Sequence, residues 1–292
     1  MLLTKNNVYI VGELVEVKDF RTLQYGADNK NAVSATVVIK CNLGEQENLI
    51  EARTFISEMT SKGTVNKNYS TIMDIESLLN ERVVISSAQL VSDRFWAANS
   101  QQLINTTRVN FTLIRKARAA ETEDKATFEF GGFVYTPLQE VLDENQDTKY
   151  YQMTLGQANY KGDNMFTVNF IVDKDNIAAI KSIQENYEQY ATVEISGVLQ
   201  TIVTQSTKET PVAFGDPVVK TYNNVDKKYI ITGGSEVVTG EGEYTEEVLK
   251  NLLTTYKEEA ASIQAKASSA DTKTSTPSAA PKAKKSSLAG LI

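Results

Sequence analysis

Residues 33–56 read VSATVVIKCNLGEQENLIEARTFI, and they contain two runs rich in β-branched and apolar residues, Val33–Lys40 and Leu49–Ile56. Runs of this composition are typical of β-strands. A further run, Val8–Val17, precedes them and carries a glycine, Gly12, that permits a bend or a bulge. The sequence therefore predicts three successive strands within residues 8–56.

The next segment has the periodicity of a helix. Apolar residues of Tyr69–Leu79 recur at helical spacing, and Asn68 is a candidate cap for the helix. Two further strands are predicted at Arg82–Val91 and Arg108–Ile114. The order of elements in this part of the chain is thus three strands, a helix and two strands.

The same order occurs a second time. The predicted elements are strands at Glu129–Val141, Tyr150–Leu155 and Phe166–Val172, a helix at Asp175–Tyr187, and strands at Thr192–Val203 and Val218–Ile231. This order is that of the OB-fold, a five-stranded, partly open Greek-key barrel, although a small α+β domain of another topology would share it. We predict a mainly β fold with two tandem OB-like five-stranded barrels, spanning residues 6–120 and 125–240.

The last part of the chain differs in composition from the barrels. Thr245–Ala265 has an apolar stripe, which predicts a C-terminal helix within residues 243–266 that docks on the second barrel. Residues 267–292 consist largely of Ala, Ser, Thr, Lys and Pro, a composition that predicts a disordered tail. The tail ends in the apolar residues Leu288–Ile292, a candidate docking peptide.

Composition excludes several classes of chemistry. Histidine is absent and Cys41 is the only cysteine, so histidine-dependent catalysis, an internal disulfide and a multi-cysteine metal site are all excluded. The Asp173-Lys-Asp175 sequence could hold magnesium, but its position before an apolar helix favours Asp175 as a helix cap. Acids of residues 140–147 are interpreted as a solvated loop. We therefore expect no enzyme activity, no cofactor and no metal.

Membrane insertion and secretion are not indicated. No apolar run approaches the roughly 20 residues that a membrane-spanning helix needs, and the first residues do not resemble a secretory signal. The sequence therefore predicts a cytoplasmic protein, in the host cytoplasm if the chain is phage-encoded.

Charge is unevenly distributed along the chain. The net charge is −7, which argues against a nucleic-acid partner, but residues 1–120 carry +2 and residues 121–240 carry −9. All seven arginines lie in the first of these segments: Arg21, Arg53, Arg82, Arg94, Arg108, Arg115 and Arg118. Arginine suits forked contacts with phosphate and stacking on bases, so the first barrel is the better candidate for binding nucleic acid.

Aromatic residues accompany several of these arginines. Alternation along Leu49–Ile56 puts Arg53 and Phe55 on the outward face, unless the register is reversed and Phe55 is in the core. Arg94-Phe-Trp96 falls in the predicted loop between the fourth and fifth strands, where the aromatic rings either stack on bases or anchor the loop. The candidate DNA-binding residues are Arg21, Tyr25, Lys40, Arg53, Phe55, Arg94, Phe95, Trp96 and Arg108.

Three features of the chain support a resemblance: the tandem order of elements, the Leu49–Ile56 strand with Arg53 and Phe55, and the predicted flexible tail. In these features the chain resembles single-stranded DNA-binding proteins. Its two-barrel form resembles those encoded by bacteriophages. The resemblance covers about residues 6–235 and rests on the order of elements. It implies a non-enzymatic protein that coats and protects single-stranded DNA during replication, recombination or repair, with little sequence preference. An oligomer, and replication or recombination proteins bound through the tail, are the further partners implied.

One departure from the family pattern and two alternative functions accompany this resemblance. Bacterial relatives usually have an acidic tail, whereas Lys282, Lys284 and Lys285 make this one basic, which puts the usual recruitment of replication enzymes in doubt. A structural or interaction protein built on β-barrels, such as a phage virion component, is the alternative function. A magnesium-dependent nuclease is a third hypothesis.

Overall fold

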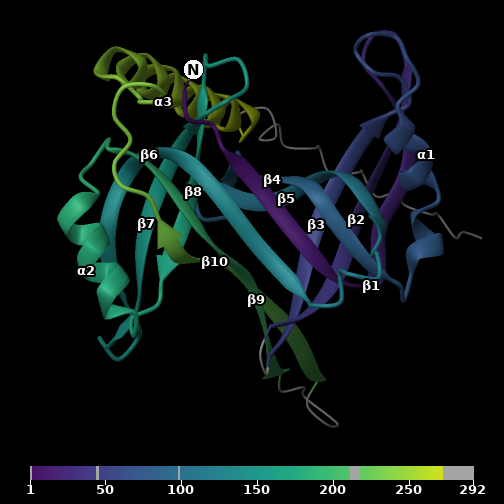
Figure 1. Ribbon diagram of the computed structural model, residues 1–292, viewed down its shortest axis with the longest axis horizontal. Coiled ribbons are helices and arrows are strands. Elements are labelled where there is room, and N and C mark those ends of the chain that lie inside the picture. The colour runs from purple at the N-terminus through teal and green to yellow at the C-terminus, as the bar shows by residue number, and fades with distance from the viewer. Residues whose placement is uncertain (1, 44–45, 98, 211–217, 272–292) are drawn as a thin grey trace, which may run out of the picture.

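The computed structural model describes residues 2–43, 46–97, 99–210 and 218–271, which form two β-barrels side by side and three α-helices (Figure 1). The first barrel contains β1 (Asn6–Tyr25), β2 (Lys30–Leu43), β3 (Gln46–Ser57), α1 (Lys67–Met73), a 3-10 turn η1 (Ile75–Leu78), β4 (Arg82–Ala97) and β5 (Gln102–Lys116). The second contains β6 (Lys125–Leu142), β7 (Thr148–Ala158), β8 (Met165–Val172), α2 (Ile177–Asn186), β9 (Thr192–Thr210) and β10 (Val218–Gly234). Helix α3 (Glu246–Asp271) follows.

The strand order closes each set of five strands into a barrel. The ten strands form one sheet in the order β2-β3-β5-β4-β1-β6-β7-β8-β10-β9, and the additional pairings β1–β2 and β6–β9 close the two barrels. In both barrels the third and fifth strands are parallel, as at Ala52 with Val109 and at Ile171 with Ile230. The predicted fold class, two tandem OB-like barrels, is confirmed.

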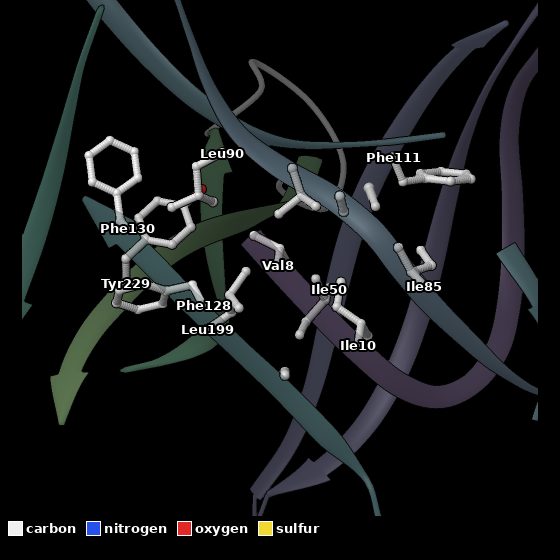
Figure 2. Packing of buried hydrophobic residues seen from close by; sticks show 14 of the residues in the cluster. Val8, Ile10, Ile50, Ile85, Leu90, Phe111, Phe128, Phe130, Leu199 and Tyr229 are labelled. Carbon is white, nitrogen blue, oxygen red and sulfur yellow. The ribbon is translucent and has the colours of Figure 1, made fainter. Parts of the chain in front are cut away.

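A strand pair and a shared core join the two barrels. Residues 6–11 of β1 pair antiparallel with residues 125–130 of β6. The Asn6 side chain donates to the Leu90 carbonyl at 2.8 Å and to the Gln157 side chain at 3.1 Å, so it ties strands of both barrels together. Figure 2 shows Val8 of β1 lying between residues of the first core, such as Ile10, and residues of the second, such as Phe128.

The predicted helices are present, but both predicted caps are wrong. The side chain of Asn66 caps α1 by accepting from the Asn68 N–H at 3.1 Å, so Asn68 lies inside the first turn. The side chain of Asn176 caps α2 by accepting from the Ala179 N–H at 3.2 Å, while the Asp175 N–H donates to the Asp173 side chain in the turn before the helix. Helix boundaries of this kind shift by one or two residues whenever several polar side chains compete to cap the first turn.

Helix α3 packs along the second barrel, at the top of the molecule in Figure 1. Leu249, Leu252 and Tyr256 are buried there with Phe133 and Met165, as the apolar stripe predicted. The helix also contacts β4 of the first barrel and continues to Asp271, beyond the predicted end at residue 266. The rest of the predicted tail, residues 272–292, lies outside the described residues. Among the described helices, none combines the length and the apolarity needed to cross a bilayer.

Candidate nucleic-acid interface

The outward face of β3 carries a cation beside an aromatic ring. Ala52, Thr54 and Ile56 are buried in the first barrel, whereas Arg53 is exposed and Phe55 is 50% exposed. The predicted alternation along this strand is confirmed, and the alternative register with Phe55 in the core is wrong. A phenylalanine that is half exposed on a strand loses the free energy that burial would give it, which makes it a candidate for contact with a ligand.

Strand pairing extends this face across β2 to β1. Arg21 of β1 pairs with Ser34 of β2, which pairs with Phe55, so these three side chains share one face. The Tyr25 ring lies edge-on to Phe55, with centroids 5.1 Å apart and planes 82° apart. In the same way Lys18 of β1 pairs with Thr36 of β2, and Thr36 pairs with Arg53 of β3, so Lys18 and Arg53 share this face. We call the set Lys18, Arg21, Tyr25, Arg53 and Phe55 the basic-aromatic face.

Arg108 of β5 adjoins the basic-aromatic face. Arg53 pairs with Asn110, and the Arg108 Nε donates to the Asn110 side chain at 3.0 Å. Burial lowers the pKa of Arg108, and the positive charge of Arg53 lowers it further, which reflects two guanidinium groups held near one another. Asp93 of β4 forms an ion pair with Arg108 and offsets part of this charge.

The predicted loop at residues 94–96 is instead part of a long hairpin. Strands β4 and β5 remain paired as far as Ala97 with Gln102, so the prediction that Arg94-Phe-Trp96 lies in a loop is wrong. Arg21 and Tyr25 lie beyond the predicted strand Val8–Val17, but the structure extends β1 to Tyr25, so both residues are in a strand. A two-stranded hairpin that projects beyond a barrel has no continuous core to impose a hydrophobic pattern, which is why its strands are hard to recognise.

Alternation along β4 separates the three residues of this segment. Phe95 is 48% exposed and shares a face with Asp93, and therefore with Arg108 on the neighbouring strand. Arg94 and Trp96 point to the opposite face. The structure thus brings Phe95 to the side of the basic-aromatic face and does not bring Arg94 or Trp96 there.

Arg94 is engaged by helix α3. Its guanidinium carbon lies 3.6 Å from the centre of the Tyr256 ring, and its Nη1 donates to the Tyr256 carbonyl at 2.9 Å. It also forms an ion pair with Glu259, and its side chain is only 7% exposed. The bonds that a phosphate would need are therefore already made within the protein.

Lys40 lies on the outer side of β2, where acids compensate its charge. It forms an ion pair with Glu47 and pairs across the strands with Glu13. Hydrogen bonding to Glu47 raises the pKa of Lys40. The charge of Lys40 is therefore partly compensated within the protein.

Two lysines on or beside this face were missed by the sequence interpretation. Lys18 faces outward because a β-bulge between Leu14 and Glu16 shifts the register of β1, whereas alternation continued from the buried Val8, Ile10 and Leu14 would have placed it in the core. Lys227 comes from β10 of the second barrel, and its Nζ lies 2.7 Å from the Glu51 carboxylate on β3. That hydrogen bond lowers the pKa of Glu51. No local pattern could have revealed a contact between residues so far apart in the chain.

The candidate catalytic and metal-binding groups do not converge. Asp143 accepts hydrogen bonds from the backbone N–H groups of Asn145 and Asp147 at 2.8 and 3.0 Å, which stabilises its own turn. Within the described ranges, no three acidic or cysteine side chains are placed to hold a metal ion. Cys41 is buried, and burial raises the pKa of its thiol to about 12, so it stays protonated at neutral pH.

Comparisons with known proteins agree with this architecture. A family model described as YorF matches residues 5–266. The structure of the wild-type single-stranded DNA-binding protein from Thermus aquaticus is similar, with a TM-score of 0.50 and 9% identity over 84% of this chain and 98% of that chain. At that identity the likeness concerns the fold.

Two further comparisons add little. A replication protein A heterotrimer bound to single-stranded DNA matches with a TM-score of 0.25 and 12% identity, over 77% of this chain and 49% of that chain, which is too weak to support an argument. No curated protein matches the sequence.

Proposed function

The chain belongs to the YorF family, and from that premise and the geometry above we propose that it binds single-stranded DNA without enzymatic activity. The observation that carries the proposal is the basic-aromatic face, where the exposed Phe55 ring lies between Arg53 on its own strand and Tyr25 across the sheet. The fold that this chain shares with a protein named for binding single-stranded DNA supports it.

The chemistry of the face suits a single strand. Bases of any sequence have a flat π-face that can stack on Phe55 or on the neighbouring Tyr25, and the cations on either side can neutralise phosphates. Because neither interaction reads the hydrogen-bonding edge of a base, binding would show little sequence preference. Phe95, at the end of the β4–β5 hairpin, extends the same surface toward a further base.

We propose further that the protein coats and protects single-stranded DNA during replication, recombination or repair. The cytoplasm, or a host's cytoplasm if the chain is phage-encoded, is the proposed location. The apolar end of the tail, Leu288–Ile292, is proposed to dock replication or recombination proteins. These roles rest on the resemblance of the sequence to single-stranded DNA-binding proteins.

Equilibrium titration of fluorescently labelled oligothymidine with the full chain tests the binding. We expect Phe55→Ala to weaken it by about five- to a hundredfold, because stacking of one base is worth roughly 1–3 kcal/mol. Ile177→Ala is the control, since Ile177 is an apolar residue, 68% exposed, on α2, which lies on the side of the second barrel opposite the first barrel (Figure 1). Equal effects of the two substitutions would contradict the assignment of the face.

The salt dependence of the same titration tests the phosphate contacts. Three to five cationic contacts with a single strand predict a slope of about −2 to −3.5 in log affinity against log salt concentration. Lys18, Arg21, Arg53 and Arg108 are the residues of the first barrel that would make them. A slope near zero, or no binding of oligothymidine, would favour the alternative of a structural or interaction protein.

A further inference from the structure

A carboxylate lies among the cations of the proposed DNA-binding surface. Glu51 is on the outward side of β3, two residues before Arg53. Its Oε1 atom lies 3.4 Å from the Nζ of Lys18 on β1, a lysine that also pairs with Glu16 at 3.2 Å. Its Oε2 atom lies 2.7 Å from the Nζ of Lys227 on β10. One acid therefore bridges lysines from the two barrels.

Holding the barrels together does not require this bridge. Next to it, the buried Asn48 side chain donates to the Leu199 carbonyl at 2.8 Å and accepts from the Thr201 N–H at 2.6 Å. These bonds fix β9 of the second barrel against β3, with Asn48 only 2% exposed. Strand β9 pairs with β10, which carries Lys227, so the Asn48 bonds already anchor the β9–β10 hairpin to β3. The ion pairs of Glu51 can therefore be replaced by other ion pairs without separating the barrels.

The Glu51 carboxylate has the charge that a phosphate would bring. A phosphodiester and a carboxylate each carry one negative charge and accept hydrogen bonds from ammonium groups. The side chains of Glu51, Lys18 and Lys227 are 31%, 40% and 34% exposed, so both ion pairs are in contact with water. Ion pairs with that exposure contribute little to stability, and an incoming anion can replace them at small cost.

We propose that Glu51 is an internal competitor of the DNA backbone, and that Lys18 and Lys227 are phosphate ligands which it occupies in the free protein. The inference rests on the proposed function and extends it in one respect. Lys227 belongs to the second barrel, so a strand lying on the basic-aromatic face continues across the junction between the barrels at this point.

Glu51→Gln tests the proposal in the full chain with labelled oligothymidine. The amide removes the charge and keeps the shape, so we expect about two- to fivefold tighter binding. We also expect a salt slope up to about 0.7 steeper, because Glu51→Gln leaves Lys227 without its carboxylate partner, whereas Lys18 keeps its ion pair with Glu16 at 3.2 Å. Glu185→Gln is the matched control: it makes the same change of charge next to Lys181, in an exposed ion pair on α2, and should leave affinity and slope unchanged.

The double variant Glu51→Gln/Lys227→Gln should lose part of the gain, and Lys227→Gln alone should bind more weakly than the wild type. Thermal unfolding of each variant separates these effects from loss of structure, and the Lys227→Gln measurement decides the matter if Glu51→Gln does not fold. If the wild-type protein binds oligothymidine and the folded Glu51→Gln variant binds no more tightly, this inference is wrong and the proposed function stands. Wild-type protein that does not bind oligothymidine overturns the proposed function and this inference with it.

Discussion

Arg94 and Phe95 are adjacent in the chain, yet they face environments that predict different roles. Arg94 is covered by Tyr256 and pairs with Glu259, both in α3, whereas Phe95 is half exposed beside Asp93. An arginine can serve as a packing residue because its planar group stacks on a ring while its edges donate hydrogen bonds. Residue type alone therefore does not show whether an arginine or an aromatic residue contacts a ligand or packs inside the protein.

For Arg94 we expect a structural effect. Arg94→Ala should lower the free energy of unfolding by about 2–3 kcal/mol, because it removes a charge-assisted hydrogen bond and a cation–π contact from a largely buried site. Urea denaturation of the purified variant measures this. The exposed Arg118→Ala should change stability by no more than about 0.5 kcal/mol. If Arg94→Ala has normal stability and binds DNA more weakly, Arg94 contacts DNA and the structural role is wrong.

Fluorescence of the single tryptophan distinguishes the two faces of β4. Trp96 lies on the face opposite to Phe95, so saturating oligothymidine should leave its emission nearly unchanged. In the double variant Phe95→Trp/Trp96→Phe, the indole is moved to the side of the basic-aromatic face and should be quenched. Quenching of the wild-type protein and not of the double variant would assign base stacking to Trp96.

At the scale of elements, α3 stabilises the arrangement of the barrels by packing on both. We expect Leu252→Ala to cost about 2–5 kcal/mol in the free energy of unfolding, since this side chain is 1% exposed among Phe133, Met165 and Tyr244. Lys250→Ala, on the exposed side of the same helix, should change stability by about 0.5 kcal/mol or less. Equal stabilities of the two variants in urea would show that the helix is not docked.

Elements with a buried stripe or face could be predicted from the sequence, and those without one could not. The strand of Arg53 and Phe55 and the docked helix of Leu252 leave regular hydrophobic patterns, because a core selects every second or every third to fourth residue. The hairpin that carries Phe95 extends beyond the barrel and leaves no such pattern. The contact of Glu51 with Lys227 depends on tertiary packing alone, so no local signal exists for it.

At the scale of the whole molecule, the two barrels share a core. Val8 and Ala126, from the paired strands β1 and β6, belong to one continuous cluster of buried apolar residues that includes both barrel interiors (Figure 2). Separating the barrels would expose this apolar surface and the hydrogen-bonding edges of two strands.

We therefore expect a single cooperative unfolding transition for the full chain. Circular dichroism reports on both barrels and Trp96 fluorescence reports on the first, so the two denaturation curves should coincide. The continuous core also implies that fragments 1–120 and 121–240 are less stable than the same residues in the intact chain. Two separate transitions would mean that the barrels are independent units and that the shared cluster contributes little.

The β1–β6 strand pair also has a consequence for how the protein responds to dilution. Two barrels that met as separate molecules would dissociate as their concentration fell, since association between chains obeys mass action. Here one chain supplies both partners, and only residues 117–124 separate β5 from β6. The local concentration of one barrel around the other is fixed by that short connection, so the pair persists at any abundance of the protein in the cell.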